Sequence, residues 1–216
     1  NRGACVQPCR RGYTVQDRDK EITLAIENEY IMSPKDLCTL PFLDKVLDAG
    51  VKILKIEGRG RSPEYTKVTV GVYSEAVKAI QNGEFTEEKI AQWTERLRSV
   101  YNRDFWDGYY LGRKMGEWTQ RYGSQATKTK IFVGTVTNFF AKINVAEIRM
   151  ETQDLKVGDD IMIIGPTTGV YEDKVSEIRV DLKPVKSTEK GELCSIPVKD
   201  VIRRGDKVYK VIDAES

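Results

Sequence analysis

The sequence predicts an α/β domain followed by a small all-β domain, because the spacing of apolar residues changes along the chain. Residues 33–82 follow the order helix, strand, helix with short links, which is typical of a parallel α/β domain. From residue 131 onward, apolar residues alternate with a period of two in short segments separated by turns, which predicts a β-barrel. We therefore expect domains at residues 1–126 and 127–216.

The α/β part is organised around residues 50–65, GVKILKIEGRGRSPEY. β-Branched residues between two glycines predict a short buried strand over residues 51–56. Ser62-Pro63-Glu64 then supplies an N-cap, a proline at the first helical position and an acid in the first turn. A strand that leads through a charged, glycine-rich turn into a helix is how α/β enzymes build sites at strand ends.

Three helices are predicted around this strand. The first begins at Ser33-Pro34, with Cys38 in its next turn, and ends at Gly50. The second runs from Pro63 to about residue 82. The third covers residues 87–100 and carries an apolar stripe. Residues 101–118, rich in Tyr, Trp and Gly, are expected to be irregular.

Composition limits the possible functions. The 216 residues include 35 basic and 33 acidic side chains, so no overall charge favours nucleic acid. The absence of histidine excludes Ser-His-Asp and Cys-His catalysis, and His-ligated zinc, within these residues. Four cysteines are too few for a disulfide scaffold. No apolar run is long enough to span a membrane. We expect a cytoplasmic protein, and we expect a chain that begins at Asn1 to be a fragment.

Four motifs occur in a fixed order: NRGACVQPCR at 1–10, SPKDLC at 33–38, KIEGRGRSPEY at 55–65 and FWDGYYLGR at 105–113. Together they resemble the collagenase-like peptidase family. The resemblance implies that the first domain is the second half of a TIM-like (β/α) barrel. It also implies that the second domain is a small antiparallel β-barrel similar to the second domain of elongation factor Tu.

The resemblance extends to RNA hydroxylases that hold a four-iron, four-sulfur cluster through four cysteines. Cys5 and Cys38 match two of these ligands, and the other two are expected upstream of Asn1. Cys9 fills a family position, but its assignment as a ligand stays open. The alternatives are free cysteines, or a disulfide among these three in the fragment. Cys194 lies in a strand-like run and is expected to be a small buried core residue.

The charged turn of residues 55–65 supplies the candidate site residues. Glu57 follows the predicted strand, and Arg59 can hold a carboxylate or phosphate through two hydrogen bonds. We assign catalytic roles to Lys55, Glu57 and Arg59, and substrate binding to Arg61 and Tyr65. The alternative is that these are solvated residues at the rim of the domain.

The aromatic segment is a second candidate. Its rings could stack bases while Arg103 and Arg113 bind phosphates, or it could pack across a domain edge. Basic residues near and within the β domain are further candidates for phosphate contact, namely Lys128, Lys130, Arg203 and Arg204.

Three functions follow as hypotheses. The first, by resemblance, is prephenate-dependent hydroxylation of the wobble uridine of tRNA by the full-length protein, with an iron–sulfur cluster. The second is proteolysis, for which no HExxH or GxSxG motif is present and Glu57 would act through a carboxylate or metal. The third is a non-catalytic interaction module that dimerises to cover exposed edges. We expect the fragment alone to be inactive.

Overall fold

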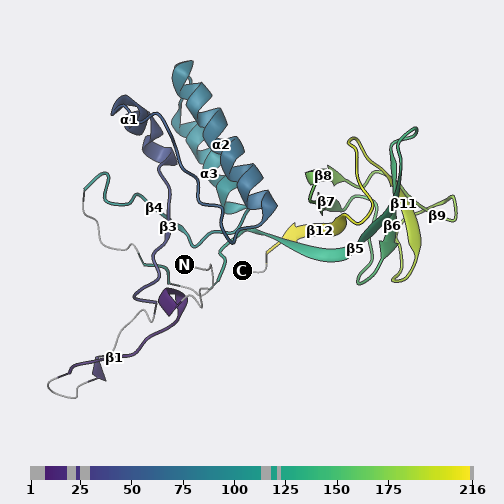
Figure 1. The fold of residues 1–216 in the computed structure, drawn as a ribbon, viewed down its shortest axis with the longest axis horizontal. Helices are drawn as coiled ribbons and strands as arrows, with labels where there is room; N and C mark the ends of the chain where they lie inside the picture. Colours follow the sequence, from purple (N-terminus) through teal and green to yellow (C-terminus); the bar gives the residue numbers. More distant parts are fainter. Residues whose placement is uncertain (1–7, 19–22, 25–29, 113–117, 121–122, 215–216) are drawn as a thin grey trace. The chain divides into compact units, whose positions relative to one another are not determined.

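The structure is a computed structural model that describes residues 8–18, 23–24, 30–112, 118–120 and 123–214. The chain divides into two compact units (Figure 1). The first unit comprises Asn1–Arg59 and Val68–Ala126, and the second comprises Gly60–Lys67 and Thr127–Ser216. Each unit contains a hydrophobic core of its own.

Helices form the core of the first unit. A 3-10 turn, η2 (Leu40–Phe42), leads into α1 (Leu43–Asp48), and α2 (Pro63–Gln81) and α3 (Glu87–Arg98) follow. The predicted second and third helices are confirmed, and the Thr86 side chain caps α3 by accepting a hydrogen bond from the backbone N–H of Lys89. In the described part of the chain, no helix has both the length and the apolar composition needed to cross a bilayer. The core combines residues of all four elements: Leu40, Leu43, Val72, Ala76, Ile90, Trp93 and Leu97.

The predicted helix start at Ser33 is wrong. Residues that follow it form β3 (Asp36–Leu37), which pairs in parallel with β4 (Phe105–Trp106). The backbone N–H groups of Asp36 and Cys38 donate to the carbonyl oxygens of Asp104 and Trp106, each at 2.9 Å. These donors are committed to the neighbouring strand, so the helix begins only at η2, which has a proline in its first turn.

The predicted buried strand over residues 51–56 is also wrong. This segment has no regular structure, and the side chain of Ile53 is 86% exposed. A strand needs a partner for its N–H and C=O groups, and no strand of the described residues pairs with this segment. The remaining strands of the first unit are the antiparallel pair β1 (Val15–Gln16) and β2 (Thr23–Leu24). Half of a TIM-like barrel is therefore not confirmed.

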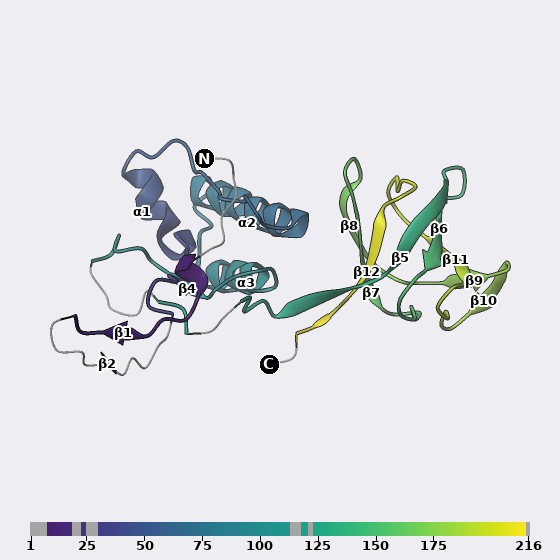
Figure 2. The ribbon, with the colours of Figure 1, turned by 60° about the horizontal axis from the view of Figure 1, so that its bottom comes forward.

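The second unit is a single antiparallel sheet around one core (Figure 2). Its strand order is β10-β9-β11-β6-β5-β12-β7-β8. The first and last strands of the unit, β5 and β12, are neighbours in the middle of the sheet. The bounds are β5 Lys128–Phe140, β6 Val145–Met150, β7 Asp160–Gly165, β8 Gly169–Lys174, β9 Ile178–Val180, β10 Lys183–Val185, β11 Leu193–Pro197 and β12 Lys207–Asp213.

The period of two predicted six of these strands but missed β8 and β10. Half of the residues of β8 are charged, and β10 contains Pro184, which is tolerated because β10 is an edge strand. A bridge between Lys156 and Ser187 joins the segments next to β7 and β10. The sheet has two edge strands, β10 and β8, that are not hydrogen-bonded to each other. A closed barrel like that of elongation factor Tu is therefore not confirmed. Cys194 is 1% exposed, which confirms its core assignment, and burial raises the pKa of its thiol to about 12.

A small polar cluster ties β8 to the segment before β12. The Tyr171 hydroxyl donates to the carboxylate of Asp173 at 2.7 Å, and the Lys199 ammonium donates to the same carboxylate at 2.7 Å. The hydrogen bonds from Lys199 and Tyr171 lower the pKa of Asp173 to about 2. Ionised Asp173 therefore stabilises the folded unit.

Acid is expected to remove this stabilisation. Because the pKa of Asp173 is lower in the folded state than its ordinary value of 3.8, its contribution is complete above about pH 4 and disappears as the pH falls towards 2. The exposed Lys199 limits the effect to about 1–2 kcal/mol. Urea unfolding followed from pH 6 to pH 2 measures it, and Asp173→Asn should flatten the acid limb. Glu151→Gln, which alters an exposed carboxylate of the same unit, should leave it intact; equal curves for all three proteins would contradict the assignment.

Candidate functional site

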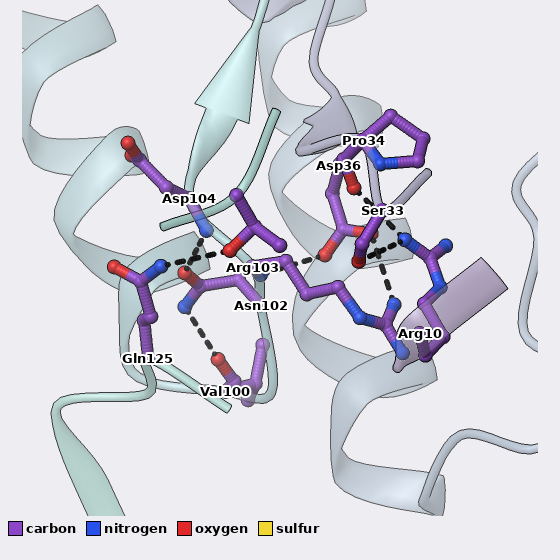
Figure 3. A network of polar contacts seen from close by, with 10 residues as sticks. Arg10, Ser33, Pro34, Asp36, Val100, Asn102, Arg103, Asp104 and Gln125 are labelled. Carbon is purple, nitrogen blue, oxygen red and sulfur yellow. Dashed lines mark hydrogen bonds and ion pairs between the residues drawn. The ribbon is translucent and has the colours of Figure 1, made fainter. Parts of the chain in front are cut away.

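Polar contacts join the first two sequence motifs in the first unit (Figure 3). The guanidinium of Arg10 donates to the Ser33 hydroxyl at 2.9 Å and to the Pro34 carbonyl oxygen at 3.0 Å. The backbone N–H of Thr119 donates to the carbonyl oxygen of Ser33, so a third segment is held at the same point. Ser33 is buried, and these bonds satisfy both its hydroxyl and its carbonyl.

Arg103 belongs to the same network and is held by a carboxylate of the protein (Figure 3). Its guanidinium lies 3.5 Å from the Asp36 carboxylate, and its backbone N–H donates to that carboxylate at 2.9 Å. The guanidinium also lies over the Tyr101 ring, 5.1 Å from its centroid. With a side chain only 13% exposed, Arg103 positions β3 against β4, and this arrangement does not present it to a phosphate. Its predicted partner Arg113 lies outside the described residues.

The three residues predicted to be catalytic lie on an exposed loop. Lys55, Glu57 and Arg59 are all exposed. The Glu57 carboxylate accepts a hydrogen bond from the backbone N–H of Arg59 at 2.7 Å, which closes a local turn. Among the described residues, no hydrogen bond or ion pair links these three to Cys9 or Cys38. Their catalytic role stays a prediction.

Cys38 is buried beside α2. Its sulfur lies 3.8 Å from the Tyr73 hydroxyl, which also accepts from the backbone N–H of Thr39 at 3.2 Å. Burial raises the pKa of the Cys38 thiol and, with the neighbouring thiol, raises the pKa of Tyr73. The thiol form is therefore favoured here. Cys9 lies in a 3-10 turn, η1 (Pro8–Arg10), and is partly exposed.

These cysteines can be tested against the iron–sulfur cluster that the resemblance implies. The described residues contain no group of three or more His, Cys, Asp or Glu side chains that could hold a metal ion. Cys5 lies outside them. Cys38 supplies one soft sulfur donor in a protected position, which suits iron, but the described residues alone do not fit a four-cysteine cluster.

Two aromatic and two cationic side chains come together on the surface of the second unit. Phe132 of β5 and Tyr209 of β12 are paired directly across the two strands, with ring centroids 5.8 Å apart. The Lys207 ammonium lies 5.4 Å from the Phe132 centroid, and the Lys130 ammonium lies 5.1 Å from the Tyr209 centroid. We call these four residues the cation–aromatic face. Both rings are partly exposed, so the face combines stacking surfaces with positive charge.

The end of the third motif belongs to the same unit. The Arg61 guanidinium lies 5.2 Å from the centroid of the Tyr65 ring. The Glu64 carboxylate accepts a hydrogen bond from Lys130 at 2.5 Å. Burial raises the pKa of Glu64, but the hydrogen bonds from Lys130 and Ser62 outweigh it and hold this pKa below its usual value. Residues Arg61–Tyr65 therefore lie with the cation–aromatic face, whereas Lys55–Arg59 belong to the first unit.

Sequence reasoning found only Lys130 of this face. Of the other predicted phosphate ligands, Lys128 pairs with Asp213 at 2.8 Å and Arg203 donates to the Thr168 hydroxyl at 3.4 Å. The sequence does contain a pattern that could have indicated the other three residues of the face, Phe132, Lys207 and Tyr209. Lys-Ile-Phe at 130–132 and Lys-Val-Tyr at 207–209 are the same pattern, and a period of two places each lysine and ring on one side of its strand.

Comparison with known proteins identifies the family. The family model for peptidase family U32 matches residues 1–120, which is more than half of the chain and contains all four motifs. The chain belongs to this family, so the resemblance to collagenase-like peptidases is confirmed.

The curated relatives have names that refer to two different activities. A collagenase of Porphyromonas gingivalis is 54% identical over 210 residues, which cover 97% of this chain and 51% of that protein. The tRNA hydroxylation protein P1 of Bacillus subtilis is 32% identical over 173 residues, covering 77% of this chain and 40% of that protein. The chain thus spans about half the length of these and other curated relatives that it matches.

One solved structure that resembles part of this chain is the C-terminal domain of a Geobacillus thermoleovorans protein described as a U32 peptidase. It is 15% identical, covers 37% of this chain and 90% of that chain, and has a TM-score of 0.35. At this score the similarity carries no conclusion about the fold.

Proposed function

We propose that this chain is part of an enzyme that modifies tRNA by hydroxylating a base, and that its second unit binds the RNA. The observation that carries the proposal is the cation–aromatic face, Lys130, Phe132, Lys207 and Tyr209. Proteins that bind unpaired RNA combine aromatic side chains, on which bases stack, with cations that contact the backbone. The family relationship to proteins called tRNA hydroxylation proteins supports the same substrate.

The proposal also includes an iron–sulfur cluster and an oxygen donor for the hydroxylation. In the full-length protein, Cys5 and Cys38 would ligate a four-iron, four-sulfur cluster together with two cysteines outside this chain. The cluster would supply the redox chemistry, and prephenate would supply the oxygen atom. Arg59 would then hold the anionic co-substrate, because a guanidinium binds a carboxylate through two hydrogen bonds, and Glu57 would help to position the substrate. Anaerobic purification with iron and sulfide assays tests this part, and an iron-free, colourless protein would exclude it.

Mass spectrometry of tRNA tests the substrate. Deleting the gene is expected to remove hydroxylation of the wobble uridine, and the full-length protein supplied in trans should restore it. A Phe140→Leu protein, altered in an exposed ring of β5 outside the face, should restore it equally well. Unchanged tRNA modification in the deletion strain would exclude the proposal.

Proteolysis is the second candidate, and the 54% identity to a collagenase favours it. Glu57 is the residue we assign to it, because the exposed carboxylate could activate a water molecule. Purified full-length protein should then cleave gelatin, and Glu57→Gln should lose this cleavage while Glu84→Gln, another exposed carboxylate, keeps it. Failure of the wild-type protein to cleave gelatin would remove this candidate.

A further inference from the structure

The hairpin formed by β9 and β10 has an unusual turn. Val180 pairs with Lys183, so only Asp181 and Leu182 connect the strands. Both residues have positive φ values, 48° and 65°. Two-residue turns with positive φ at both positions favour Asn or Asp followed by Gly. Asp181 fits this preference, but a leucine in the left-handed region is strained by its Cβ atom.

Packing against the described residues of its unit does not compensate Leu182 for this conformation. Its side chain is 86% exposed, so it gains no packing within the described structure. Glycine would form the same turn without strain and without placing an apolar side chain in water. Strained residues that packing does not explain occur most often where a protein meets a ligand. The tip of this hairpin is therefore a candidate for contact with a partner.

The charge of the hairpin indicates what kind of partner it meets. Lys183, Lys186 and Lys190 are exposed, and none forms an ion pair within the described residues. Nearby, Arg179 pairs with Glu177 at 2.6 Å. Basic residues outnumber the two acidic residues, Asp181 and Glu189, between positions 179 and 190. An apolar tip with uncompensated lysines beside it matches a partner that is anionic and also offers apolar faces, as RNA does.

The hairpin is also continuous with the cation–aromatic face. It forms one edge of the sheet (Figure 2). Val180 pairs with Cys194, which places the turn next to Leu193, a side chain that is 46% exposed. Directly paired residues point to the same side of a sheet, so one row leads from this position to the face. The row consists of Leu193, Arg149, Thr135 and Lys207.

We propose that the β9–β10 hairpin is a second RNA contact, in which Leu182 inserts between two bases while Lys183 and Lys186 bind the flanking phosphates. This inference rests on the proposed function. An enzyme that hydroxylates a base must take that base out of its stack, and an apolar wedge lowers the cost of unstacking. The strain at Leu182 is then the consequence of placing an apolar side chain at the tip of a rigid turn.

The test replaces Leu182 in the full-length protein and follows stability and RNA binding together. The probe is an unmodified anticodon stem–loop RNA with 2-aminopurine in the loop, whose fluorescence rises on unstacking. Leu182→Gly should raise the Tm by about 2–4 °C, because the strain is relieved. It should also weaken binding about tenfold and abolish the fluorescence rise. The control Leu182→Met keeps a long apolar side chain and should match the wild type in every measurement.

Distinct outcomes separate this inference from the proposed function. If Leu182→Gly binds and unstacks the probe like the wild type, or if it lowers the Tm, the hairpin contact is wrong while RNA binding by the face can still hold. If the wild-type protein does not bind the probe at all, the proposed function fails with it. A Leu182→Gly protein that keeps RNA binding but loses gelatin cleavage would assign the tip to a polypeptide and overturn the RNA contact.

Discussion

Replacing Phe132 and Tyr209 together by leucine is expected to weaken binding of a tRNA anticodon stem–loop to the full-length protein by at least tenfold. Leucine keeps the apolar bulk of each side chain, so the sheet should remain folded while the two stacking surfaces and their cation–π contacts are lost. Stacking of one base on an aromatic side chain contributes roughly 1–3 kcal/mol. Fluorescence anisotropy at several salt concentrations measures the affinity.

The control for this experiment lies in the same strand. Phe140 ends β5 and is 41% exposed, but it lies outside the cation–aromatic face. Phe140→Leu should therefore bind the RNA like the wild-type protein. The salt dependence of the double variant should stay close to that of the wild type, because Lys130 and Lys207 are retained. An unchanged affinity in a double variant that unfolds at the wild-type temperature would rule out the face as an RNA-binding surface.

Gly134→Ala is expected to destabilise the second unit by roughly 3 kcal/mol. Gly134 lies in β5 beside β6, where a Cβ atom would overlap the backbone carbonyl oxygen of Arg149. Backbone atoms in the middle of a sheet cannot move aside as a flexible side chain can. Urea unfolding followed by circular dichroism measures the loss.

Gly71→Ala is the matched substitution in a helix. A Cβ at Gly71 would meet only the Arg96 guanidinium at 3.8 Å, an ordinary contact. Because glycine weakens a helix interior, alanine should stabilise α2 by about 0.5–1 kcal/mol. Opposite signs for the two alanine substitutions are expected, and a Gly134→Ala protein as stable as the wild type would mean that β5 and β6 are not packed as described.

Local patterns predicted the parts of the fold that local physics determines. The stripe of Ile90, Trp93 and Leu97 predicted α3, and its residues are buried as expected. Alternation predicted β5 and β12 but could not show that they are neighbours. The strand predicted at 51–56 is absent. Its β-branched residues have a strand propensity, but a strand forms only where a pairing partner is available.

The candidate site was predictable to the same limited degree. Motifs identified the family, and two of these motifs contain Arg10 and Ser33. They did not reveal that Arg103 is held by Asp36, since that contact joins residues 67 positions apart. The cation–aromatic face was missed because its two halves are separated by most of the second unit, although each half shows the same short pattern.

The central position of β12 has a consequence for how the second unit forms during synthesis. Lys207 pairs with Thr135 of β5 and with Ile164 of β7, so the last strand made joins two halves of the sheet. These pairings span long stretches of sequence, and loops of this length must close before the contacts stabilise them. A nascent chain that ends before Lys207 leaves the facing edges of β5 and β7 unpaired and open to association with other chains. Ribosome stalling before β12 is synthesised should therefore cause aggregation, whereas synthesis through Asp213 should allow the sheet to assemble in one cooperative step.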